Sequence, residues 1–222
     1  VLSDEDSLHL RSAILTGLLS RYAKAGFTVQ LHIGAQRTTS TRLRTLAGAA
    51  GGYAAMGSTV NVAAIVRLLD AAEQTPEGLP NILLFTLNPA DNAVMATLCG
   101  SYSADGQQAL VSQGPAWWWC DHALGIENAL GAISSFGVLS EFIGMTTDSR
   151  SILSFVRHDY FRRLLCRWVA EKISIGDFPD DDDLIVPFMS LGAKGVISVL
   201  SNVFPTETQL MANAALDGDF DT

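Results

Sequence analysis

Three strand patterns, separated by connections long enough to hold a helix, constrain the fold of this chain most strongly. Residues 27–34 alternate strictly between apolar and polar side chains, which is typical of a strand with one buried face. Residues 81–87 form an almost continuous apolar run, as buried parallel strands require, and residues 109–113 carry a weaker strand pattern. Connections of this length are crossovers rather than hairpins, so we expect parallel strands with helices packed outside the sheet.

Helical periodicity accounts for most of the remaining sequence. The expected helices cover residues 3–26, 62–73, 92–99, 121–136, 154–172 and 184–191, with a last helix beginning at Pro205. Two further strands are expected at 142–147 and 194–199. The alternation of strand and helix predicts the α/β class.

Two architectures fit this alternation: an open, doubly wound sheet and a β/α barrel. A doubly wound nucleotide-binding fold has a GxGxxG turn after its first strand, whereas the glycines of residues 48–52 lie inside a long loop and lack that spacing. The barrel is therefore favoured. Because a complete barrel needs about 250 residues, we expect a partial parallel β/α barrel: a half-barrel of about five strands with helices outside.

Charge and hydropathy exclude several classes of partner. The chain carries 14 basic and 23 acidic residues, a formal net charge of -9, and no basic stripe that could bind nucleic acid. No apolar run approaches the roughly 20 residues needed to cross a bilayer, and no signal peptide opens the sequence. The three cysteines show no CxxC spacing, which favours reduced thiols. We expect a cytoplasmic protein without a nucleic-acid or membrane partner.

Polar and aromatic side chains follow each expected strand. Since the active site of a barrel is built at the carboxyl ends of its strands, these exits are the candidate functional positions. They carry His32 and Arg37, Asn88 and Asp91, Trp117 to Trp119 with Asp121, and Asp148 with Arg150. Each has a structural alternative: an interior histidine, a turn, core packing of the tryptophans, or a helix cap.

Five segments, in this order, resemble the signatures of uronate (glucuronate) isomerases. They are Leu31–Ala35 with Arg37, Asn88–Asn92, Gly114–Trp118 with Asp121, Gly144–Ser151 and Arg157–Arg163. The resemblance covers about residues 1–180 and implies the second half of a metal-dependent TIM barrel related to the amidohydrolases. It also implies the isomerisation of an aldose uronate, glucuronate or galacturonate, to its ketose.

The same resemblance implies roles for individual residues. Asp148 would be the metal ligand and a proton acceptor, and Arg150 would hold a substrate oxygen or carboxylate. With His32 they would form the catalytic set. The substrate-binding residues would be Arg37, Trp117, Trp118 and Asp121. The implied cofactor is a divalent metal, zinc in the first place, and the implied ligand is a uronate sugar.

Two departures from the family pattern lead us to expect impaired activity. The family has an HxH pair of metal ligands, but the histidines here are His9, His32, His122 and His158, and no two form such a pair. The asparagine run after the first signature is replaced by residues 38–40, Thr-Thr-Ser.

Residues 182–203 resemble the last αβα portion of dihydrodipicolinate synthase, another β/α barrel. The Schiff-base lysine of that family lies on a strand without a counterpart here, so Lys194 does not inherit its role. We expect a chimera with isomerase-like units at 1–180 and an aldolase-like tail at 181–222, packed as one domain. The alternatives are an inactive structural module that forms homo-oligomers through exposed half-barrel edges, and an aldolase-like lyase.

Overall fold

The computed structural model describes residues 3–48, 51, 53–103, 109–147, 149 and 151–178. The chain divides into two compact units, Val1–Asp148 and Ser149–Thr222. The expected boundary at residue 180 lies outside the described residues and remains a prediction, as do the strand at 194–199 and the two helices of the tail.

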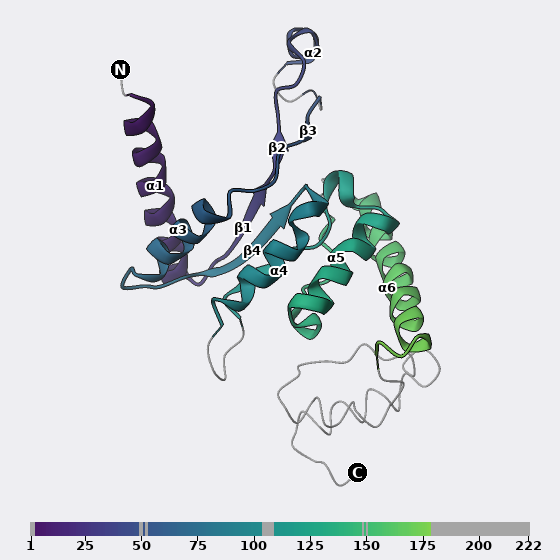
Figure 1. Ribbon diagram of the computed structural model, residues 1–222. Helices are drawn as coiled ribbons and strands as arrows, with labels where there is room; N and C mark the ends of the chain where they lie inside the picture. Colours follow the sequence, from purple (N-terminus) through teal and green to yellow (C-terminus); the bar gives the residue numbers. More distant parts are fainter. Residues whose placement is uncertain are drawn as a thin grey trace. The chain divides into compact units, whose positions relative to one another are not determined.

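The sheet of the first unit consists of parallel strands arranged in chain order (Figure 1). β1 (Thr28–Ile33) pairs with β4 (Asn81–Thr86), and β4 pairs with β5 (Val111–Gln113). These strands lie within the three patterns expected from the sequence. The connections between them contain α3 (Val62–Glu73) and α4 (Asn92–Gly100), so each is a crossover.

Three further α-helices are also close to the expected ranges. α1 (Asp4–Ala25) begins with a reciprocal capping box between Ser3 and Asp6 and ends at Gly26, whose φ of 69° suits glycine. α5 (Ala123–Phe136) follows β5, and α6 (Val156–Ser174) belongs to the second unit. Short 3-10 helices occupy Pro89–Asp91, Trp118–Cys120, Leu139–Glu141 and Ile152–Phe155. None of the helices in the described part of the chain is long and apolar enough to cross a bilayer.

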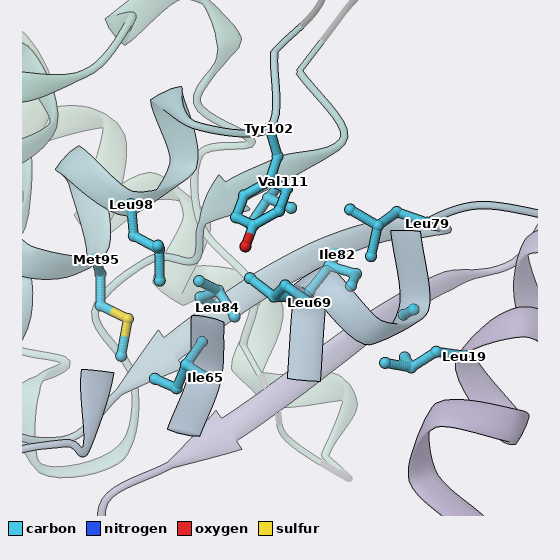
Figure 2. Close-up of a cluster of buried hydrophobic side chains, with 11 residues drawn as sticks. Leu19, Ile65, Leu69, Leu79, Ile82, Leu84, Met95, Leu98, Tyr102 and Val111 are labelled. Carbon is cyan, nitrogen blue, oxygen red and sulfur yellow. The ribbon is translucent and has the colours of Figure 1, made fainter. Parts of the chain in front are cut away.

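The main core lies on one face of the sheet. Ile82 and Leu84 of β4 are almost completely buried there, among side chains from α1, α3 and α4 (Figure 2). The other face of β4 contributes to a separate cluster of Leu83, Phe85, Leu87 and Trp117, which come from the strand and its following loops. Helices on a single face, with sequential parallel strands, are the arrangement of a β/α barrel; a doubly wound sheet has helices on both faces. The partial-barrel class is confirmed.

An arm not expected from the sequence separates β1 from α3. β2 (Ala35–Gln36) pairs antiparallel with β3 (Ala55–Met56), and α2 (Thr41–Ala47) lies between them (Figure 1). Gly57 donates its backbone N–H to the carbonyl of Gly34 at 2.7 Å, which closes the base of the arm. Gly34 has a φ of 93°, a conformation that favours glycine, so the chain can turn directly after β1.

The expected strand at 142–147 was wrong. These residues adopt no regular structure and follow the short 3-10 helix at Leu139–Glu141. Gly144 has a φ of 80°, which interrupts an extended conformation. β5, moreover, has β4 as its one partner in the described residues. Without a hydrogen-bonding neighbour, the apolar pattern of this segment is not sufficient to form a strand.

A glycine at the start of α5 provides a test of the packing between this helix and the loop before it. A Cβ on Gly125 would lie 2.0 Å from the carbonyl oxygen of Cys120, whereas a Cβ on Gly131 of the same helix would meet nothing within 4 Å. We expect Gly125→Ala to lower the free energy of unfolding by about 3 kcal/mol. Gly131→Ala should raise it by roughly 0.5–1 kcal/mol through helix propensity. Urea unfolding measures both, and equal effects of the two variants would contradict this packing.

Because the thiol of Cys99, on α4, is largely buried, we expect the free energy of unfolding to decrease at alkaline pH. Burial raises the pKa of this thiol from 9.0 to about 12. Between pH 9 and pH 12 the thiol stays protonated in the folded chain but ionises in the unfolded chain. The free energy of unfolding is therefore at its full value below pH 9 and falls as the pH rises toward 12. Between pH 8 and pH 10 we expect the free energy of unfolding to fall by about 1 kcal/mol because of this thiol. In the Cys99→Ala variant this contribution to the fall should be absent.

The matched control for this measurement is Cys166→Ala, which removes an exposed thiol. This variant should keep the alkaline loss of the original chain in urea unfolding at the two pH values. A Cys99→Ala chain with the full alkaline loss would show that Cys99 is not its source.

Candidate functional site

The candidate site lies where the three parallel strands end. His32 is near the carboxyl end of β1, Trp117 to Trp119 follow β5, and Arg37 follows β2 at the base of the arm. The polar face of β1, with Thr28, Gln30 and His32, is more exposed than the face that packs against the helices, as the alternation predicts.

His32 is held by aromatic contacts. It lies opposite Phe85 in the parallel register of β1 and β4. The two rings stack with centroids 4.5 Å apart and an interplanar angle of 29°, and the Trp117 ring lies 4.3 Å from the imidazole. Phe85 is fully buried, and a Cβ on Gly114 would lie 2.7 Å from its ring, so the glycine is needed for this close packing. The imidazole of His32 therefore packs against two aromatic side chains, Phe85 and Trp117, both of which are buried.

The three consecutive tryptophans differ in their exposure. Trp117 is buried, whereas Trp118 and Trp119 stack on one another and form a partly exposed surface that we call the aromatic wall. Trp117 is 5% exposed, and its indole N–H donates a hydrogen bond of 3.0 Å to the carbonyl of Thr86. Trp118 is 41% exposed and has a φ of 53°, in the left-handed region that non-glycine residues rarely adopt. Its ring stacks on Trp119 with centroids 4.2 Å apart and an interplanar angle of 13°. Strained backbone of this kind is concentrated at functional sites.

Arg37 contacts this exposed wall. Its guanidinium carbon lies 5.8 Å from the centroid of the Trp118 ring, within the range of a cation–π interaction. The Trp118 ring is in turn 5.7 Å from the ring of Trp117. The contacts thus run continuously from His32 through the two tryptophans to Arg37, and they join the end of β1, the residue after β2 and the segment after β5.

The other expected site residues are not part of this continuous set. Asp121 is half-buried and is linked to the wall through its backbone, where its N–H donates to the carbonyl of Trp118 at 3.2 Å. Asp148 and Arg150 lie outside the described residues, so their expected roles remain predictions.

A buried carboxylate that supports the site was not expected in this role. Asp91 is 2% exposed and accepts hydrogen bonds from the backbone N–H of Val60 and from the hydroxyl of Thr86, each at 3.2 Å. The carbonyl of Thr86 holds the indole of Trp117, so Asp91 fixes the strand end that anchors the aromatic wall. The sequence indicated a polar strand exit here, but Val60 is 31 residues away and no local pattern signals the contact.

Cys120 lies next to the wall but is poorly suited to act as a nucleophile. It is buried, its thiol donates to the carbonyl of Leu87 at 3.2 Å, and burial raises its pKa above the ordinary value. Since the thiolate is the reactive form, this environment disfavours covalent chemistry at Cys120.

The described residues do not by themselves form a metal site. They contain no group of three or more His, Cys, Asp or Glu side chains arranged to hold a metal ion. The absence of HxH spacing in the sequence agrees with this result. We therefore derive no chemical step through a metal from these side chains.

With this arrangement of side chains at the ends of parallel strands established, the chain can be compared with known proteins. A model of the glucuronate isomerase family matches residues 1–190, and a model of the dihydrodipicolinate synthetase family matches residues 167–222. The two matches overlap, and the first covers most of the chain. Both resemblances seen in the sequence are confirmed.

Individual relatives support the first match. The chain is 41% identical over 189 residues to a uronate isomerase of Vibrio vulnificus (strain YJ016), covering 85% of this chain and 40% of that protein. It is 39% identical over 184 residues to a uronate isomerase of Haemophilus influenzae (strain PittGG), covering 83% of this chain and 39% of the relative. The chain therefore spans about 40% of the length of these relatives.

A solved structure gives the same result. The fold is similar to that of a uronate isomerase from Thermotoga maritima, with a TM-score of 0.71 and 26% identity over 80% of this chain and 38% of the other. Together with the family match over residues 1–190, these similarities show that the chain belongs to the glucuronate isomerase family.

Proposed function

We propose that this chain forms the substrate-binding part of a uronate isomerase site, which acts in the aldose–ketose isomerisation of glucuronate or galacturonate. The observation that carries the proposal is the continuous contact from His32 through Trp117 and Trp118 to Arg37. It combines a group that can transfer a proton, an apolar wall and a cation beside one another at the end of a parallel sheet.

The proposed reaction determines what such a site has to provide. The proton on C2 of the aldose is removed and a proton is added at C1, while the C1 carbonyl becomes a hydroxyl and the C2 hydroxyl becomes a carbonyl. This exchange needs a base near the carbon acid and donors to the developing enediol oxygens. The imidazole of His32 can donate and accept protons, and its stacking on Phe85 limits its rotation.

Arg37 and Trp118 are suited to bind the substrate itself. A guanidinium can donate two parallel hydrogen bonds to a carboxylate, the group that distinguishes a uronate from a neutral sugar. The exposed Trp118 ring offers an apolar surface for the C–H face of the sugar. We assign the uronate carboxylate to Arg37 and the sugar face to Trp118, with Asp121 positioned behind the wall.

Turnover by this chain alone is expected to be impaired. The sequence contains no HxH pair, which the resemblance implies as two of the metal ligands. The expected roles of Asp148 as metal ligand and of Arg150 as substrate ligand, with zinc as the cofactor, are part of the proposal. A metal would supply Lewis-acid polarisation of the substrate carbonyl, and its other ligands would have to come from outside this set of residues.

A second candidate function is a non-catalytic module that assembles with further copies. It is supported by β1, which has β4 as its one strand partner among the described residues and leaves one edge open. The aldolase-like lyase rests on the tail match alone, and Lys194 lies outside the described residues.

Substitution of Arg37 tests the recognition of the carboxylate. We expect Arg37→Lys to weaken glucuronate binding about tenfold, because lysine keeps the charge but loses the bidentate geometry. Isothermal titration calorimetry with glucuronate, and with glucose as the neutral ligand, measures the difference. Arg42→Lys, on α2 of the same arm, is the matched control and should leave the affinity unchanged. Equal affinity of the original chain for both sugars would contradict the proposal.

Substitution of Trp118 tests the apolar wall separately. Trp118→Ala removes the surface proposed for the sugar face, so it should weaken the binding of glucuronate and glucose to the same extent, by about 1–2 kcal/mol. A loss confined to glucuronate would assign Trp118 to the carboxylate instead. Leu124→Ala, which removes another exposed apolar side chain, is the control and should have no effect on either sugar.

A further inference from the structure

We propose that α2, at the end of the arm between β1 and α3, docks on α3 of a second copy of this chain, so that two copies exchange their arms. The arm is defined as residues 35–57. The contact lies outside the open edge of β1, and it does not depend on the reaction proposed for the candidate site.

The helix of the arm needs a packing partner. α2 has seven residues, none of which is buried, and isolated helices shorter than about 12–15 residues are marginal in water. Its ends are satisfied locally, since the Ser40 hydroxyl accepts the N–H of Leu43 at 3.3 Å and Gly48 donates to the carbonyl of Arg44 at 2.9 Å. Figure 1 shows α2 at the end of the arm, apart from α3 of the same chain. A second molecule would supply the burial that this helix lacks.

The charge of the arm indicates an acidic partner. Residues 35–57 contain three arginines and no aspartate or glutamate. The rest of the chain has 11 basic and 23 acidic residues, a formal net charge of -12. Among the described residues, neither Arg42 nor Arg44 takes part in an ion pair. The arm is therefore a positive segment of an otherwise acidic molecule, and another copy offers it the opposite charge.

One side of α3 combines apolar and acidic side chains, and we call it the docking face. Val62, Val66 and Asp70 follow one another at intervals of four residues, and Glu73 lies on the same side. The two valines are each 37% exposed, and both carboxylates are exposed. The docking face thus begins with a valine pair and finishes with an acidic end.

α2 carries the complementary groups in the reverse order. Arg42 and Leu46 are four residues apart on one side of this helix, and Leu46 is 73% exposed. Their separation along the helix axis, about 6 Å, equals that between Val66 and Asp70. Antiparallel packing of α2 on α3 therefore places Leu46 on the valine pair and Arg42 at the acidic end.

Exchange between two copies makes this contact twice. Each copy offers one arm and one docking face, so a two-fold axis joins both pairs and closes the assembly. At each contact the positive arm meets the acidic face of the other copy. The attraction is therefore local and acts in both directions, although each copy carries a net charge of -9.

Charge reversal tests the exchange by sedimentation velocity of the full chain. We expect a dimer that weakens as salt is added, because the paired charges are screened. Arg42→Glu and Asp70→Lys should each raise the dissociation constant at least tenfold, since each places like charges together twice in the dimer. An equimolar mixture of the two variants should restore the dimer. In the mixed pair, the reversed arm meets the reversed docking face, and the original arm meets the original face.

The matched control is Arg44→Glu, which reverses a charge of the same arm on the other side of α2 and should change the dissociation constant less than twofold. Circular dichroism of each variant checks that the chain is folded. A monomeric original chain, a dimer that Arg42→Glu leaves intact, or a mixture that stays dissociated would each overturn the proposal. A monomer in which Arg42→Glu speeds hydrogen exchange in α3 would place α2 on its own α3. Nucleic acid that copurifies with the original chain but not with Arg42→Glu would place a polyanion there, and either result would also overturn the exchange.

Discussion

The parallel register between β1 and β4 is the constraint on which the candidate site depends. It places His32 directly beside Phe85, so that the imidazole stacks on a buried ring and meets Trp117 from the next strand exit. A shift of one residue would move His32 to the helix-covered face, because side chains alternate along a strand. The register is itself fixed by Val29, Leu31 and Ile33, which pack against the core on that face.

The site is built on this register by a few long-range contacts. Asp91 ties the loop before α3 to the end of β4, and the end of β4 holds the indole of Trp117. Trp118 and Arg37 then extend the contacts to the base of the arm. The arm is held together in part by Thr39, whose hydroxyl donates to the carbonyl of Tyr53 at 2.6 Å. The hydroxyl of Thr39, within residues 38–40, therefore contributes to the structure of the arm.

Local patterns predicted the parts of the fold that depend on neighbouring residues. The alternation at 27–34 and the apolar run at 81–87 located β1 and β4. The expectation that strand exits meet at one face grouped His32, Arg37, Trp117 and Trp118, which the structure joins by contacts, while their roles in catalysis and binding remain predictions. The segment 142–147 has the composition of a strand, but strand formation needs a partner that the sequence cannot show. The buried role of Asp91 depends on its contact with Val60, 31 residues away, so no local signal predicted it. No local pattern indicated the positive φ of Trp118 either.

The position of the His32 ring tests this account most directly. In proton NMR spectra of the folded chain, we predict nuclear Overhauser contacts from the imidazole protons of His32 to the rings of Phe85 and Trp117, with an upfield shift from the stacked phenyl ring. Contacts from these imidazole protons to Leu84 and to side chains of α3 would instead place His32 on the helix-covered face. That result would contradict the register and the site derived from it.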